Sequence, residues 1–158
     1  MSLDLGPALR AAFLNQQDAT LQALAESIVD RLGKVDEVDP SLFAFRPVPD
    51  DALDPMILIN AQVSVTEADA IRSERPIVIA DIAIYGKQGT PGDPSDQSPI
   101  VEAIAFDVRK LFHRQRFAVQ PDGYSVIDIR ATGPVPAPTD DDGEMGRVVT
   151  LTIRLRSI

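Results

Sequence analysis

Apolar residues recur at helical spacing twice near the start of the chain, in residues 5–13 and 21–32. The polar residues between them, 15–18, leave two arrangements: one long helix with an interruption, or two helices with Asp18 as the N-cap of the second. We favour two helices. Gly33 is the expected stop, because glycine readily takes the left-handed conformation that often ends a helix.

A third helical pattern, in residues 98–116, lies at the centre of the chain. Ser98 is the expected N-cap, since its hydroxyl can accept a hydrogen bond from a backbone N–H, and Pro99 suits the first helical position. The apolar positions share one face, which predicts a helix packed on an apolar surface. They are Ile100, Val101, Ile104, Ala105, Val108, Leu111 and Phe112.

Alternation of apolar and polar residues predicts β-strands on both sides of this helix. Residues 57–65 precede it, residues 124–130 and 147–156 follow it, and residues 42–46 predict a short additional strand. Residues 77–85 are apolar on both faces apart from Asp81, which is typical of a central strand with one half-buried carboxylate. In the last strand Val149, Leu151, Ile153 and Leu155 alternate with Thr150, Thr152, Arg154 and Arg156.

The order of these elements predicts an α+β fold. We expect a mainly antiparallel sheet of about 4–5 strands, with the N-terminal helices and the central helix packed on one face. The length of 158 residues fits a single domain over residues 1–158. Proline, glycine and acidic residues predict irregular loops near 34–56, 86–98 and 132–146, and a loop as long as the last is often functional.

Composition narrows the classes of function. The chain has no cysteine and one histidine, His113, which excludes disulfides, thiolate metal sites and imidazole clusters. Its net charge of −9 at pH 7 opposes wrapping of nucleic acid, which needs an excess of Lys and Arg. No apolar run reaches roughly 20 residues, the length of a membrane span, and the N-terminus has no signal-peptide pattern. We therefore expect a soluble protein made in a cytoplasm.

Local patterns that suggest chemistry are weak. Residues 86–92 place glycines and Lys87 between a strand and a helix, but a phosphate-binding loop carries its Gly-Lys-Ser/Thr at the helix N-terminus. The acidic run 140–144 lacks the spacing of a calcium loop. His113 has no nucleophile placed beside it, and Asp81 is more simply a hydrogen-bonded carboxylate than a functional one. We expect no cofactor, no metal and no enzymatic activity. A small enzyme or ligand-binding domain around Asp81 or Lys87 is the least favoured alternative.

Taken in order, these elements resemble those of the phage tail terminators, the small tail-completion proteins of tailed phages and tail-like particles. The resemblance covers most of the chain and carries over no catalytic residue. Its residues are the N-terminal helix through 23–32, the stretch Leu-Phe-Ala-Phe-Arg-Pro-Val-Pro at 42–49, the strands at 55–60 and 81–86, the helix at 100–112 and the closing strand from Arg147.

The resemblance implies a homo-oligomeric ring, a hexamer in this family, that caps the tail tube, stops its growth and offers a surface to the head-side connector or neck protein. The implied partners are further copies of the chain, the tube protein, the connector and, where the tail is contractile, the sheath protein. DNA would pass through without specific binding, and no membrane is involved. The implied location is the tail or neck of the virion, after assembly in the host cytoplasm. The alternative is a head-completion or connector protein of the neck.

Candidate contact residues follow from residue type, because interfaces concentrate on aromatic and Arg side chains and exposed sheet edges can pair across subunits. We expect residues 57–65 or the C-terminal strand to provide such an edge. The candidates for the subunit or partner interface are Phe43, Phe45, Arg46, Tyr85, Lys87 and Arg147. The candidates for an acidic lumen or loop surface, past which DNA would slide because like charges repel, are Asp140, Asp141, Asp142 and Glu144.

Overall fold

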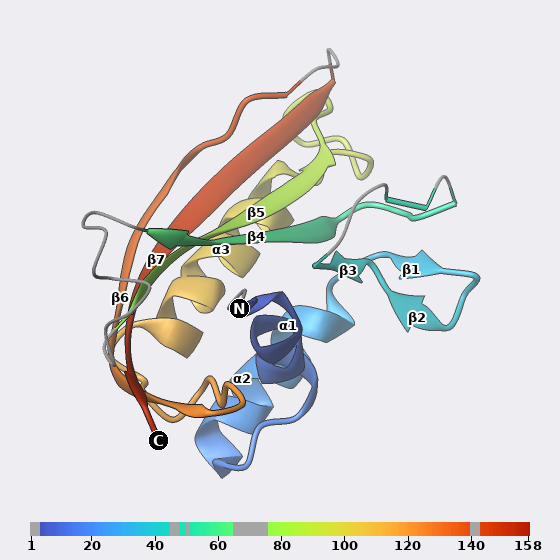
Figure 1. Ribbon diagram of the computed structural model, residues 1–158. Coiled ribbons are helices and arrows are strands. Elements are labelled where there is room, and N and C mark those ends of the chain that lie inside the picture. Colours follow the sequence, from blue (N-terminus) through green and yellow to red (C-terminus); the bar gives the residue numbers. More distant parts are fainter. Residues whose placement is uncertain (1–3, 45–47, 50, 65–75, 140–142) are drawn as a thin grey trace.

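The computed structural model describes residues 4–44, 48–49, 51–64, 76–139 and 143–158 (Figure 1). Of the candidate contact residues, Phe45, Arg46 and Asp140 to Asp142 lie outside this described part. Of the predicted strand at 42–46, the first two residues form β3 (Leu42–Phe43), whereas Ala44 is described and lies outside the strand.

A five-stranded sheet in the order β3-β4-β5-β7-β6 forms the body of the molecule (Figure 1). Its long strands are β4 (Met56–Ser64), β5 (Ile77–Lys87), β6 (Tyr124–Pro136) and β7 (Glu144–Ser157). All neighbours are antiparallel except β3 and β4, which run parallel. A separate two-stranded sheet consists of β1 (Lys34–Val35) and β2 (Asp39–Pro40). The predicted α+β fold with a mainly antiparallel sheet is confirmed.

Three helices cover one face of the sheet: α1 (Gly6–Leu14), α2 (Ala19–Asp30) and α3 (Ser98–Phe112) (Figure 1). Apolar side chains of alternate strand positions point to this inner face and are buried with the helices in one core. The opposite, outer face has no helix packed on it among the described residues. The inward-facing positions are Ile57, Ile59, Val78, Ala80, Ile82, Ile84, Ile129, Ala131, Val149, Leu151, Ile153 and Leu155.

The N-terminal region forms two helices, as favoured from the sequence. The carboxylate of Asp18 accepts hydrogen bonds from the backbone N–H groups of Thr20 and Leu21, which confirms it as the N-cap of α2. The predicted role of Gly33 is wrong, because α2 ends at Asp30 and Gly33 has no left-handed φ. Gly33 instead allows a close backbone approach: a Cβ there would lie 2.0 Å from the carbonyl oxygen of Leu53.

Helix α3 confirms the central helical pattern but differs at both ends. Ser98 is its first residue and Gln97 occupies the N-cap position, so the predicted cap is wrong by one residue. The helix ends at Phe112 and not at residue 116, because Arg114 takes a left-handed φ of 59°. Ile100, predicted on the apolar face, is exposed; the other six predicted positions are buried.

Strand β5 has the central position predicted for it, between β4 and β7. Only one of its faces is buried, however. Ile79 and Asp81 point to the outer face and are exposed, so the expectation of a half-buried Asp81 is wrong. The prediction of a central strand from this apolar run is therefore correct, but the prediction that both of its faces are buried is wrong.

Two expectations about edges and loops also need correction. Strand β7 lies between β5 and β6, so the C-terminal strand is not an edge. The long irregular loop expected at 132–146 is shorter, because β6 continues to Pro136 and β7 begins at Glu144. At the opposite edge of the sheet, β3 pairs only with Ile57 and Leu58. Within the described residues, the rest of β4 therefore has no strand on the side that faces away from β5.

Candidate assembly surfaces

A shallow groove of about 250 Å³ lies on the outer face of the sheet. Four apolar residues on neighbouring strands line it. Phe43 on β3 is paired with Leu58 on β4, Leu58 is paired with Ala83 on β5, and Ala83 is paired with Val148 on β7. Tyr85 and Pro138 complete the apolar lining. The structure thus brings together two of the predicted interface aromatics, Phe43 and Tyr85, on one surface. Phe43 is buried there and Tyr85 half-buried.

Asp81 lines the polar end of this groove. Its carboxylate accepts a hydrogen bond of 2.8 Å from the hydroxyl of Thr150, which is its direct partner on β7. Asn60 stands opposite it on β4. The interpretation of Asp81 as a hydrogen-bonded carboxylate is correct in kind, although the donor is a side-chain hydroxyl and not the backbone or an Arg.

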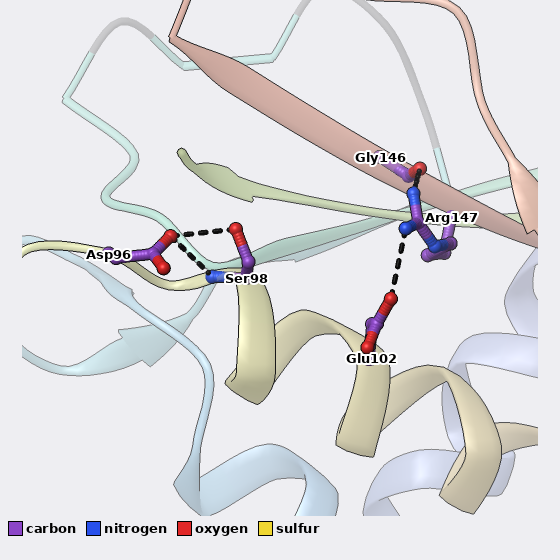
Figure 2. A network of polar contacts seen from close by, with 5 residues as sticks. All are labelled: Asp96, Ser98, Glu102, Gly146 and Arg147. Carbon is purple, nitrogen blue, oxygen red and sulfur yellow. Dashed lines mark hydrogen bonds and ion pairs between the residues drawn. The ribbon is translucent and has the colours of Figure 1, made fainter. Parts of the chain in front are cut away.

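A second hollow, of about 430 Å³, lies between the N-terminus of α3 and the start of β7. Its walls carry Asp96, Ser98, Glu102, Glu144 and Arg147. Figure 2 shows the guanidinium of Arg147 between the carbonyl of Gly146, at 3.0 Å, and the carboxylate of Glu102, at 2.9 Å. This ion pair joins α3 to β7, and it occupies the Arg147 side chain that the sequence suggested for an interface.

At the start of α3, the hydroxyl and backbone N–H of Ser98 already donate within the protein itself. The carboxylate of Asp96 accepts hydrogen bonds from the hydroxyl and backbone N–H of Ser98, at 2.7 and 3.1 Å (Figure 2). It also accepts one from the backbone N–H of Gly89. The Ser98 hydroxyl, followed by these N–H groups, lowers the pKa of Asp96 below its ordinary value of 3.8. A fixed negative charge therefore stands where a phosphate would have to bind.

Lys87 and Glu144 lie at the same end of the sheet as this hollow. They are direct partners on β5 and β7, so Lys87 belongs to a strand end and not to a phosphate-binding loop. Glu144 is half-buried at the start of β7. Whether these residues contact a partner stays a prediction.

The two-stranded sheet at 34–40 was not foreseen from the sequence. We name residues 34–40 the acidic arm; it extends to one side of the body (Figure 1). Asp36 and Glu37 turn the chain with left-handed φ values of 51° and 63°, and Val38 beside them is 74% exposed. A hydrogen bond with Asp51, together with that residue's charge, raises the pKa of Asp36. Asp51 therefore lies beside the three acidic residues of the arm, Asp36, Glu37 and Asp39, which outnumber its basic residue, Lys34.

Arginines gather at the far end of the outer face, also unforeseen. We name Arg130, Arg154 and Arg156 the arginine patch; all three are exposed. Arg154 stands between Asp128 on β6 and Ile77 on β5, and Thr152 stands between Arg130 and Ile79. Arg130 is ion-paired with Asp128 at 3.2 Å, while Ile79 is 39% exposed beside the group. The strict alternation in residues 147–156 already placed Arg154 and Arg156 on one face, so two of the three arginines of this patch had a signal in the sequence.

Within the described residues, no group of three or more acidic or histidine side chains is placed to hold a metal ion. The same part of the chain contains no helix that is both long and apolar enough to cross a membrane. His113 accepts a hydrogen bond at Nδ1 from the backbone N–H of Ala131, at 3.1 Å, and so fixes the end of α3 to β6.

Comparison with solved structures finds the same fold in a chain from the "Virion of native gene transfer agent (GTA) particle". The match covers 99% of this chain and 100% of that chain, with a TM-score of 0.59 and 13% sequence identity. At this identity the likeness establishes the fold alone. No protein-family model matches the chain, and no curated protein does.

Proposed function

We propose that this chain is a structural component of a phage-like particle. The observation that carries the proposal is the shared fold over essentially the full length of both this chain and the gene transfer agent virion chain. The sequence resemblance to tail terminators, reached from the order of helices and strands, supports the same class independently.

Within such a particle, the role we propose is that of a tail terminator. Copies of the chain form a ring, hexameric as the resemblance implies, on the last ring of the tail tube. The ring stops tube growth and presents a surface to the connector at the head. The outer face of the sheet, on which no described helix packs, supports this role, because it offers the apolar groove beside Phe43 and Tyr85 to a partner.

Electron microscopy of particles made without this protein tests the proposal. A terminator is expected to leave overlong tails, because nothing stops the tube. Tails of normal length that fail to join heads would instead assign the chain to the neck, as a head-completion or connector protein. Normal particles would exclude both roles.

A further inference from the structure

We propose that copies of this chain associate head to tail, with the acidic arm of one copy on the arginine patch of the next. The inference rests on the self-association in the proposed function and names the surfaces through which it occurs. It commits to a second copy of the same chain as the partner of each surface.

Charge complementarity between the two surfaces is the first support. Besides Lys34, the arm carries Asp36, Glu37 and Asp39 next to Asp51, and Asp36 already has a raised pKa because of its acidic neighbours. A positive partner would relieve that repulsion. Among the described residues, the patch offers three exposed arginines beside the acidic residue Asp128, in a protein whose net charge is −9. Opposite patches of this kind fix orientation and speed association.

Each surface also has an exposed apolar residue among its charges. Val38 is 74% exposed between Glu37 and Asp39, and Ile79 is 39% exposed beside the arginines. Contact between Val38 and Ile79 would bury both, while the surrounding charges pair at the rim. An apolar centre with a charged rim is the usual arrangement of a protein interface.

The position of the two surfaces requires a second molecule. The arm begins beside Gly33, whose N–H donates to the carbonyl of Pro55, and the neighbouring Asp54 lies near Lys87 at the end of β5. Ile79 is eight residues earlier in that strand, which is roughly 26 Å away at strand spacing. The arm extends from one side of the body, and β7 carries the patch to the opposite end (Figure 1). An arm therefore cannot reach the patch of its own chain.

This contact joins two different surfaces, so it repeats from copy to copy. Such heterologous contacts close into rings when the rotation between copies permits and extend into filaments otherwise. A ring built this way would place every arm on a neighbour and leave the groove near Phe43 available for another partner.

Reversal of charge on each surface tests the inference. The arm variant carries Glu37→Arg and Asp39→Arg; the patch variant carries Arg154→Glu and Arg156→Glu. Each variant alone is expected to associate about a hundredfold more weakly than the wild type in sedimentation and native mass spectrometry, because like charges then face each other. Circular dichroism should show that both remain folded, since all four side chains are exposed.

The decisive experiment brings the reversed arm and the reversed patch together. A mixture of the two variants, and a single chain carrying all four changes, should both recover association, because opposite charges face each other again. Two control variants make equal charge changes on the exposed side of the helices: Glu26→Arg with Asp30→Arg on α2, and Arg109→Glu with Lys110→Glu on α3. Both controls should assemble like the wild type.

Three outcomes overturn the inference. The wild type remains monomeric at all concentrations in low salt, the reversed variants assemble normally, or the mixture fails to recover association. If instead the patch variant loses only binding to added double-stranded DNA, the patch is a nucleic-acid contact and the inference is wrong. Normal assembly of the reversed variants would leave the proposed ring intact, whereas unchanged tails in particles without the protein would remove the proposed function.

Discussion

Gly33 has a structural role that its sequence context does not reveal. Its backbone packs against the carbonyl of Leu53, and the atoms that an added Cβ would meet, the carbonyl groups of Leu53 and Asp54, belong to the backbone. Its N–H donates to Pro55 and its carbonyl accepts from Ser41, so this residue connects the end of α2, the base of the acidic arm and the start of β4.

We expect Gly33→Ala to lower the free energy of unfolding by about 1–3 kcal/mol, because the backbone cannot move aside as a flexible side chain would. Urea unfolding measures the change. Gly92→Ala is the matched control: Gly92 has a left-handed φ of 88° but open space around it, so only backbone strain is added. A loss at Gly33 no larger than the loss at Gly92 would contradict the close approach.

Asp96 gives a prediction that depends on pH. Its pKa is lowered in the folded state by the Ser98 hydroxyl and by backbone N–H groups, so its contribution to stability is present above pH 3.8 and is lost as the pH falls through the folded-state pKa. Asp96→Ala should therefore unfold at lower urea concentration than the wild type at pH 7. The difference should shrink as the pH is lowered below 3.8.

The control for this prediction is Asp122→Ala, which removes an exposed carboxylate in the turn before β6. That variant should follow the wild type at both pH values. A difference between Asp96→Ala and the wild type that persists unchanged in acid would mean that the carboxylate charge is not what the loop requires.

At the scale of elements, α3 is held mainly by buried apolar side chains. Ile104 and Val108 are fully buried, whereas the ion pair of Arg147 with Glu102 is partly exposed, at 25% and 52%. Exposed ion pairs contribute little, because water screens them and two long side chains must be ordered.

Two variants should separate these contributions. Ile104→Ala is expected to cost about 2–5 kcal/mol of unfolding free energy, from lost burial and a residual cavity. Glu102→Gln, which breaks the ion pair, should cost about 1 kcal/mol or less. Chemical unfolding of both variants gives the comparison. Equal losses would mean that the ion pair positions α3 more strongly than its exposure indicates.

Elements whose patterns depend on residues close together in the sequence could be predicted, whereas features that depend on distant residues could not. Helix faces and strand alternation are local, and for this reason the buried positions of α3 and of residues 149–155 could be assigned from the sequence. Strand β6 was predicted too short because Gly133, Pro134 and Pro136 indicate a loop. Proline is nevertheless tolerated at a sheet edge, which β6 forms.

The candidate site was harder to predict than the fold, because it depends on register. Arg154 and Arg156 could be placed on one face, but Arg130 joins them only through the pairing of β6 with β7 and the irregularity between Val126 and Asp128. The acidic arm had no turn signal, since its left-handed residues are Asp36 and Glu37 and not glycine. The exposure of Asp81 depended on the absence of a covering helix, which alternation within one strand does not report.

At the scale of the whole molecule, charge is distributed unevenly along the sheet. The end with the start of β7 and the arm carries Asp36, Asp39, Asp51 and Asp96 together with the basic residues Lys34, Lys87 and Arg147, while the arginine patch lies at the end of β7. Within a net charge of −9, the acidic arm and the arginine patch are therefore two local surfaces of opposite sign. A molecule of this kind is suited to contacts with copies in the same orientation, because each acidic arm then meets an arginine patch.

Val38, the exposed apolar residue of the arm, allows the apolar contribution to the contact to be measured separately from charge attraction. Val38→Ser removes the exposed apolar side chain and leaves every charge in place. Because Val38 is 74% exposed, the unfolding free energy of the single chain should hardly change. Its burial against a second copy would contribute about 1.5 kcal/mol, so association should weaken roughly tenfold.

Salt then distinguishes the two contributions to the contact. Raising the salt from about 0.1 to 1 M shortens the screening length from about 10 to 3 Å, which should weaken association of the wild type and of Val38→Ser by the same factor. Ile100→Ser, which removes an exposed apolar side chain from α3, is the control and should associate like the wild type. If Val38→Ser and Ile100→Ser behave alike, Val38 is not at the contact, and the acidic arm does not supply its apolar centre.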